Sequence, residues 1–194
     1  LAEELLAPGE PLFEYWGHEA SWLPLELYPC FGFRRAAFTI HPWWGDLVGQ
    51  HPEVADRLRR RIRDEGPLRS VDLEGEGGRG WWDLKIAKKV ATALWSSGEL
   101  AIRERRAFQR TYDLAERVIP EPLRGRRVPE GDALEALALA ALDGHGWATT
   151  TTIAQTWRLS RQRTALEQAL HRLAERGEVL PCALLASDGR RTDG

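Results

Sequence analysis

The stretch GELAIRERRAFQRTYDL, residues 98–114, decides the fold of this chain. Leu100 and Ile102 lie two positions apart in its first half, and Tyr112 and Leu114 lie two positions apart in its second half. A period of two on both sides of a polar centre is typical of two strands that turn back on each other. The segment is therefore predicted to form a β-hairpin.

Three helices are predicted ahead of this hairpin. Apolar residues recur every four positions from Val54 to Ile62, which is the spacing of one helix face. A short second helix is expected in PLRSVDL, residues 67–73, and a longer third helix in WWDLKIAKKVATALWSSGEL, residues 81–100. Three helices followed by a hairpin is the order of a winged helix-turn-helix, whose third helix commonly enters the major groove of DNA.

The same order recurs about 80 residues later. ALEALALAALDGHG, residues 133–146, repeats the first helix, WATTTTIAQTW, residues 147–157, repeats the second, and SRQRTALEQALHRLAERGEV, residues 160–179, repeats the third. The residues that close the third helix match at a spacing of 79 positions: Leu94, Gly98, Glu99 and Leu100 correspond to Leu173, Gly177, Glu178 and Val179.

The fold class expected is therefore mainly α with small β-hairpins, built from tandem winged helix-turn-helix units. Residues 1–50 are predicted to be an N-terminal segment left from a preceding domain, with the block EYWGHEA, and residues 51–120 the first winged helix-turn-helix. Residues 121–131, rich in Pro, Gly and Arg, are predicted to be a linker. Residues 132–194 are expected to form the second unit, truncated in its wing.

Composition narrows the class of protein. With 194 residues, 43% of them apolar, the chain can bury a core. Cys30 and Cys182 lie 152 positions apart, which fits neither a disulfide framework nor zinc-ligand spacing. No apolar run approaches the ~20 residues of a membrane helix, so no membrane contact is expected. The cysteine usage suits a reducing cytoplasm, and we expect a nucleoid-associated monomer. The chain contains no Met, and we expect it to be an internal portion of a longer protein.

The net charge of −2 hides an uneven distribution. Residues 1–56 hold nine acids and two bases, residues 57–127 hold eleven acids and eighteen bases, and residues 128–194 hold nine acids and seven bases. A basic middle third favours a polyanion as partner, although a solvated helix face is the plainer interpretation.

Cations and aromatic residues of the predicted third helix and wing are the candidates for contact with duplex DNA. Lysines on a helix and arginines on a wing can neutralise phosphates, and each such contact makes binding more sensitive to salt. A solvated face would carry the same lysines, and Trp81 with Trp82 can be core rather than stacking residues. Arg158, Arg161 and Arg163 of the repeat can contact DNA or pack against the first copy. The candidate DNA-binding residues are Arg79, Trp81, Lys85, Lys88, Lys89, Arg103, Arg105, Arg106 and Arg110.

FEYWGHEASWLP, residues 13–24, invites comparison with catalytic motifs. His18 and Glu19 do not form the zinc-protease motif H-E-x-x-H, because the second His is missing. They remain either an acid–base pair or polar residues within an aromatic cluster. GEGGRG, residues 75–80, matches a dinucleotide motif only formally and is predicted to be a loop. Neither a metal site nor a cofactor is expected.

Several blocks resemble the YcaQ/AlkZ-type crosslink-repair DNA glycosylases: GEPLFEYWGHEASWLP, GPLRSVDLEG, GWWDLK and ALWSSGELAIRERRAFQRTYDLAERVIP, in order and with similar spacing over residues 9–120. The resemblance implies tandem winged helices and a further β-rich domain. It also implies hydrolysis of the N-glycosidic bond of alkylated bases or interstrand crosslinks in damaged double-stranded DNA, without a metal or organic cofactor.

The Gln-x-Gln or Gln-x-Asp catalytic motif that the resemblance implies matches no position of this chain, so no catalytic residue is assigned. Glu14, Trp16, His18 and Glu19 are predicted to form part of the wall of the lesion pocket. The function expected is the DNA-binding part of a repair glycosylase. The alternative is a non-catalytic winged-helix protein, such as a transcription regulator.

Overall fold

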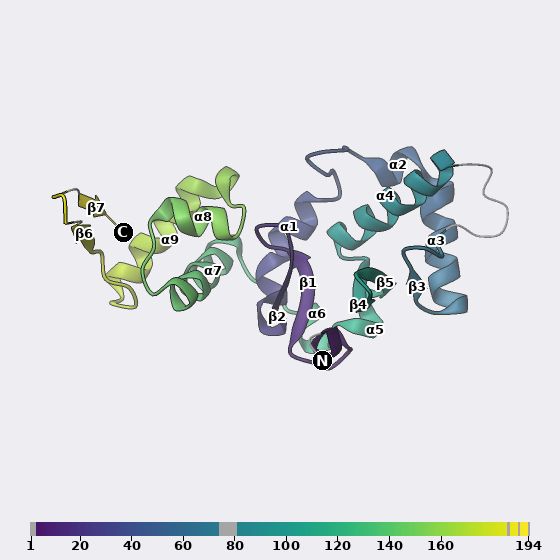
Figure 1. The fold of residues 1–194 in the computed structure, drawn as a ribbon, viewed down its shortest axis with the longest axis horizontal. Helices are drawn as coiled ribbons and strands as arrows, with labels where there is room; N and C mark the ends of the chain where they lie inside the picture. The colour runs from purple at the N-terminus through teal and green to yellow at the C-terminus, as the bar shows by residue number, and fades with distance from the viewer. Residues whose placement is uncertain (1–2, 74–80, 186, 190, 194) are drawn as a thin grey trace. The chain divides into compact units, whose positions relative to one another are not determined.

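The chain is described by a computed structural model that covers residues 3–73, 81–185, 187–189 and 191–193, without the side chains of residues 81–85, 192 and 193. Helices and small antiparallel sheets make up this part of the chain (Figure 1). The residues group into two compact units. The first holds the chain up to Tyr15 together with Trp22–Arg127, and the second holds Trp16–Ser21 together with the chain from Val128 onward.

The first unit contains most of the elements. Its helices are η1 (Glu3–Leu6), η2 (Leu25–Phe31), α1 (Gly32–Ala37), α2 (Leu47–Gln50), α3 (Pro52–Glu65), α4 (Trp81–Ser97), α5 (Ala115–Val118) and α6 (Glu121–Arg124). Its strands are β3 (Leu68–Arg69), β4 (Leu100–Arg106) and β5 (Gln109–Leu114). Strands β1 (Leu12–Trp16) and β2 (Ala20–Pro24) pair with each other in a separate two-stranded sheet, and their residues are divided between the two units.

Helix α3 confirms the first predicted helix. It begins at Pro52, whose fixed φ suits the first turn, and its apolar stripe of Val54, Leu58 and Ile62 is buried. Each fully buried Leu or Ile side chain contributes about 1.5–3 kcal/mol to stability. The helix ends at Glu65, and Gly66 follows as its C-cap with φ +97°.

The predicted short helix in residues 67–73 is wrong. Leu68 and Arg69 form β3 instead, with Leu68 opposite Tyr112 of β5 and Arg69 opposite Thr111. The strand is favoured because it buries Leu68 against the sheet, and Ser70 extends the pairing by donating its N–H to Arg110 O at 2.8 Å. The predicted loop GEGGRG lies outside the described residues.

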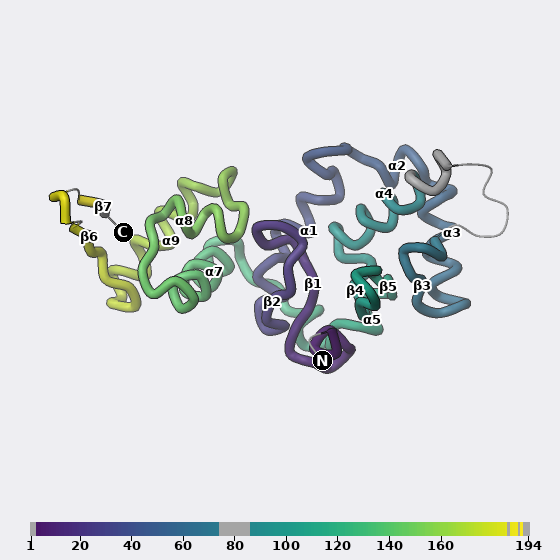
Figure 2. The backbone as a smooth tube through the Cα atoms, in the orientation of Figure 1, coloured from purple at the N-terminus to yellow at the C-terminus, as the bar shows by residue number. Residues whose placement is uncertain are grey.

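Helix α4 and the hairpin β4–β5 confirm the third predicted helix and the hairpin (Figure 2). Val90 and Leu94 of α4 are fully buried, and the helix packs against α3 and β4. Gly98 ends the helix with φ +87°, and the N–H of Glu99 bonds to Leu94 O at 2.9 Å. The three strands form one antiparallel sheet in the order β3-β5-β4.

The second unit contains α7 (Glu130–His145), α8 (Thr150–Thr156), η3 (Ser160–Gln162), α9 (Arg163–Glu175) and the small hairpin β6 (Ala183–Leu185) and β7 (Arg191–Asp193). Helices therefore form in all three segments where the repeat predicts them. Helix α9 ends as α4 does, with Gly177 at φ +72° and the N–H of Glu178 bonded to Leu173 O at 2.9 Å. Tandem winged-helix units remain a prediction, as do the four domain ranges.

Candidate nucleic-acid interface

Helix α4 carries all three lysines of the chain, Lys85, Lys88 and Lys89. Lys88 and Lys89 are exposed, whereas the neighbouring Val90 and Ala91 are fully buried. The apolar face therefore fixes α4 against the unit and leaves the ammonium groups of Lys88 and Lys89 facing solvent. Strongly hydrated point charges of this kind suit contact with phosphates, which need no fixed geometry from a lysine.

The carboxylate of Glu14, on β1, lies inside the first unit with a fully buried side chain. Arg105 donates to it from Nε to Oε2 at 2.5 Å and from Nη2 to Oε1 at 2.7 Å, and Arg110 donates from Nε to Oε1 at 2.6 Å. A buried carboxylate is tolerated only when it is paired and hydrogen-bonded. The hydrogen bonds that Arg105 donates to Glu14 raise the pKa of Arg105, so this guanidinium stays charged at neutral pH.

The register of the β4–β5 hairpin explains why the Glu14 carboxylate is needed. Arg105 of β4 lies directly opposite Arg110 of β5, and like charges in opposite positions repel. Glu14 neutralises one of the two charges from a strand outside the hairpin. The guanidinium of Arg110 also lies 4.6 Å from the ring centre of Trp95, whose Nε1 donates to Glu14 O at 3.1 Å. These two arginines are therefore turned toward the interior of the unit.

A second buried carboxylate, Asp113, binds the base of the hairpin. Arg103 donates to Asp113 Oδ2 at 3.1 Å, and Arg117 lies 3.5 Å from Oδ1. Arg117 also donates to the carbonyls of Ile62 and Arg63, both at 2.9 Å, in the last turn of α3. The Asp113 carboxylate thus ties the sheet to α3, and it partly neutralises Arg103.

The far end of the hairpin is cationic and exposed. The side chain of Arg106 is 76% exposed and lies 3.2 Å from Glu104. Phe108, in the turn between the strands, is 87% exposed. With Arg105 and Arg110 turned inward, Arg106 of the hairpin and the two exposed lysines of α4 remain the most accessible cations among the candidates whose side chains are described. Such cations can attract a polyanion at long range and neutralise its phosphates on contact.

The sequence matches the family model described as DNA glycosylase AlkZ-like over residues 2–193. The chain belongs to the AlkZ-like DNA glycosylase family. Its fold is also similar to the solved structure of the DNA glycosylase AlkZ from Streptomyces sahachiroi, with a TM-score of 0.52 and 15% identity over 94% of this chain. The match covers 52% of the AlkZ structure, so this chain spans about half the length of that protein. The family resemblance found in the sequence is confirmed.

The described candidate DNA-binding residues of this AlkZ-like chain differ in exposure and in their partners. Arg79 lies outside the described residues, and so do the side chains of Trp81 and Lys85. Of the remaining candidates, two arginines face inward and form ion pairs with Glu14, and one arginine forms an ion pair with Asp113. The other three are exposed cations. Their contact with DNA stays a prediction. The anchoring role of Glu14 was missed in the sequence because Glu14 lies 91 positions from Arg105, beyond any local pattern.

The motif FEYWGHEASWLP of the AlkZ-like chain, residues 13–24, is divided between the two units. Glu14 belongs to the first unit and borders a small cavity of about 10 Å³, too small for a nucleobase. Within the second unit, His18 Nδ1 lies 3.1 Å from Gln155 O, and Glu19 forms an ion pair with Arg158. Trp16 lies at the end of β1 and is half-buried. A role of these residues in a pocket wall stays a prediction.

An aromatic cluster forms around β1. Phe13 and Tyr15 are buried, and their rings meet those of Tyr28 and Phe31 at centroid distances of 5.3–6.2 Å. The hydroxyl of Tyr15 donates to Ser96 O at 2.6 Å, and burial raises the pKa of this phenol. The cluster fixes β1, and thereby Glu14, against the end of α4.

The segment HPWWGD, residues 41–46, was not singled out in the sequence. The ring of His41 stacks on Trp44 at 3.7 Å with an interplanar angle of 9°, and the N–H of Trp43 lies 3.2 Å from His41 Nδ1. Two backbone bonds between His41 and Gly45 close the turn. Burial lowers the pKa of His41 to about 4, so the ring is neutral at pH 7 and Nδ1 acts as the acceptor.

We expect His41 to make the first unit less stable in weak acid. Its pKa is about 4 in the folded chain and about 6.5 in the unfolded chain, so the unfolded state binds the proton first. The free energy of unfolding should therefore decrease as the pH falls from 6.5 to 4, by up to about 3 kcal/mol from this group. Urea titrations at pH 7.0 and 4.5 measure the change.

The matched variant for this test is His41→Asn, whose side-chain oxygen can replace Nδ1 as the acceptor for Trp43 but does not titrate. It should show a smaller difference in stability between the two pH values than the wild-type protein. Equal differences in the two proteins would show that His41 does not cause the acid sensitivity.

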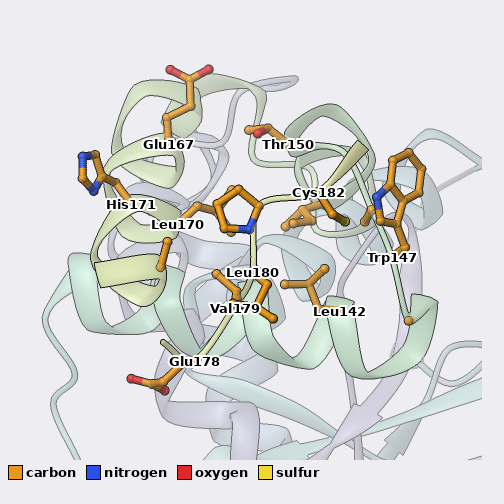
Figure 3. A pocket seen from close by; sticks show the side chains of 15 residues that line it. Leu142, Trp147, Thr150, Glu167, Leu170, His171, Glu178, Val179, Leu180 and Cys182 are labelled. Carbon is orange, nitrogen blue, oxygen red and sulfur yellow. The ribbon is translucent and has the colours of Figure 1, made fainter. Parts of the chain in front are cut away.

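The second unit of the AlkZ-like chain contains a pocket of about 860 Å³ (Figure 3). Trp147 lies on one side, and Leu170 and His171 lie on the opposite side. Leu142, Leu180 and other apolar side chains supply most of the remaining wall. The polar side chains of the lining are Thr150, Glu167, His171, Glu178 and Cys182.

The described part of the chain shows neither a cluster of metal ligands nor a membrane-spanning helix. Among those residues, no three His, Cys, Asp or Glu side chains are placed to hold a metal ion. The same residues include no helix with the length and apolar character needed to cross a membrane. Cys30 is a buried free thiol and Cys182 an exposed one.

Proposed function

We propose that this chain is the DNA-binding part of a repair glycosylase that hydrolyses the N-glycosidic bonds of alkylated bases, including those of interstrand crosslinks, in damaged duplex DNA. The observation that carries the proposal is the family match over residues 2–193. The protein would act as a monomer on nucleoid DNA. The exposed lysines of α4 and the cationic hairpin beside it supply the chemistry that duplex binding requires.

The proposal includes a pair of winged helix-turn-helix units. Helices α3 and α4 with the sheet β3-β5-β4 support the first unit, although residues 67–73 do not supply its second helix. Helices α7, α8 and α9 followed by the hairpin β6–β7 support the second. With 17 residues, α4 is about 25 Å long, enough to follow a groove or a phosphate backbone.

Binding by this chain should be indifferent to sequence and sensitive to salt. Lysines and arginines that neutralise phosphates contribute about 0.9 each to the slope of log K against log salt concentration. The 194 residues contain no Gln-x-Gln or Gln-x-Asp motif, so we expect the chain to bind duplex DNA without releasing alkylated bases from it. Fluorescence anisotropy at several salt concentrations and a base-release assay measure the two properties.

The lysine distribution provides a direct map of the interface. Because every lysine belongs to α4, an amine-reactive reagent reports on this helix and on the N-terminal amine alone. Bound duplex should protect Lys88 and Lys89 from the reagent, while the N-terminal amine serves as the internal reference. Unchanged labelling in the complex would exclude α4 as the contact surface. Tight binding to one palindrome only would instead favour a transcription regulator.

A further inference from the structure

The turn of the β4–β5 hairpin has an unexpected sequence for its conformation. Arg106 pairs with Gln109, so the loop contains only Ala107 and Phe108. Both have positive φ, +47° and +64°, as in the type I′ turn that suits the twist of a hairpin. Asn-Gly is the favoured sequence there, because residues with larger side chains are strained in this region. A bulky residue such as Phe108 is therefore a local conflict between sequence and structure.

The side chain of Phe108 adds a second conflict. The residue is 87% exposed, the highest value among the large apolar residues of the described chain. Neither the backbone conformation nor the exposure of this ring favours the folded state of the chain itself. Conflicts of this kind are expected where a residue serves contact with another molecule.

The tip is nevertheless held in place from the interior. Arg105 donates from Nη1 to Phe108 O at 3.1 Å, while its Nε and Nη2 bond the buried carboxylate of Glu14. One guanidinium thus links the turn to the core of the unit. Because Glu14 is itself fixed on β1, the position of Phe108 is set before any partner binds.

We propose that Phe108 is a preset wedge that presses its ring into the base stack of duplex DNA, with Arg105 and Glu14 as the residues that position it. Apolar side chains on DNA-binding proteins partly unstack a base step in this way, and an aromatic ring can replace the lost stacking. Arg106, exposed beside the tip, can neutralise a flanking phosphate. The inference rests on the proposed function, since it requires that the chain binds duplex DNA.

The fluorescence of 2-aminopurine tests the wedge directly, because this base brightens when it is unstacked. Titration of duplexes carrying 2-aminopurine beside a mismatch or an abasic site should give a rise in emission with the wild-type chain. Phe108→Ala should lose this rise and bind the same duplex about tenfold more weakly, since the stacking contact is gone. Phe108→Trp should retain both properties.

A second variant separates the role of the ring from the integrity of the turn. Ala107→Asn combined with Phe108→Gly gives the turn its favoured sequence and should raise the Tm by about 2–5 °C. It should nevertheless lose the rise in 2-aminopurine emission. If either variant binds as tightly as the wild type and brightens 2-aminopurine equally, the wedge is excluded. If the wild-type chain does not bind duplex DNA at all, the proposed function fails instead.

The positioning role of Arg105 has its own measurement. Arg105→Lys keeps the positive charge but removes the fork that joins Glu14 to Phe108 O. The variant should show a reduced rise in 2-aminopurine emission, while the slope of log K against log salt stays unchanged because the number of phosphate contacts is the same. An unchanged emission signal would remove Arg105 from the proposal. Loss of concentration-dependent self-association with intact DNA binding in Phe108→Ala would identify the tip as a protein contact and overturn the wedge.

Discussion

Glu14→Gln is expected to reduce the free energy of unfolding of the first unit by about 3 kcal/mol, because it removes the buried negative charge that pairs with two cations facing each other. Arg105 and Arg110 lie opposite in the hairpin and share the fully buried carboxylate of Glu14. The amide keeps the size of the side chain, so the loss reports the charge and not a cavity. Urea denaturation followed by circular dichroism measures it.

Glu104→Gln is the matched control for this prediction. Glu104 lies on the same hairpin and pairs with Arg106, whose side chain is 76% exposed, so the substitution should change the stability by less than about 1 kcal/mol. Equal losses in the two variants would show that the buried ion pairs of Glu14 stabilise the unit no more than the exposed pair of Glu104 and Arg106.

A triple substitution tests whether the lost stability comes from the charges left without a partner. Replacing Glu14, Arg105 and Arg110 together with apolar residues of similar size should recover much of the stability lost in Glu14→Gln, since no charge is then left buried without its partner. Failure to recover would indicate that the hydrogen bonds of Arg105 to the turn, rather than charge balance, hold the hairpin.

The elements with long apolar repeats were predictable from the sequence, and the short ones were not. Helices α3 and α4 and the hairpin β4–β5 follow from spacing alone, because each must bury one regular face. Residues 67–73 lack this support. Whether they form a helix or a strand depends on β5, about 40 positions away, which accepts Leu68 beside Tyr112. A seven-residue window contains no information about that partner.

The candidate site was predictable in composition but not in geometry. The sequence indicates a cationic helix and wing, and the described cations are where it places them along the chain. It cannot indicate which arginines of the hairpin face solvent, because that depends on Glu14 and Asp113. Glu14 lies 91 positions from Arg105, and the buried pairing appears only when β1 lies beside the hairpin. The positive φ of Phe108 could not be predicted from the sequence either, since Ala-Phe is not a turn sequence with a known preference for this conformation.

Charge reversal of α4 is expected to have the largest effect on DNA binding. Lys88→Glu combined with Lys89→Glu replaces two exposed cations with anions and should weaken binding to any duplex roughly a hundredfold at low salt. The loss should be equal across sequences, because phosphates carry no base information. Fluorescence anisotropy with duplexes of unrelated sequence measures it, and a loss confined to one sequence would argue for base readout by α4.

Two further variants identify the cause of that loss. Arg57→Glu with Arg60→Glu makes the same change in net charge on the exposed face of α3, and it should weaken binding much less if α4 is the contact surface. Lys88→Gln with Lys89→Gln removes the two charges without adding repulsion, and it should lower the slope of log K against log salt by about 1.8. An equal effect of the α3 and α4 reversals would mean that the chain responds only to overall charge, and the assignment of the interface to α4 would then be wrong.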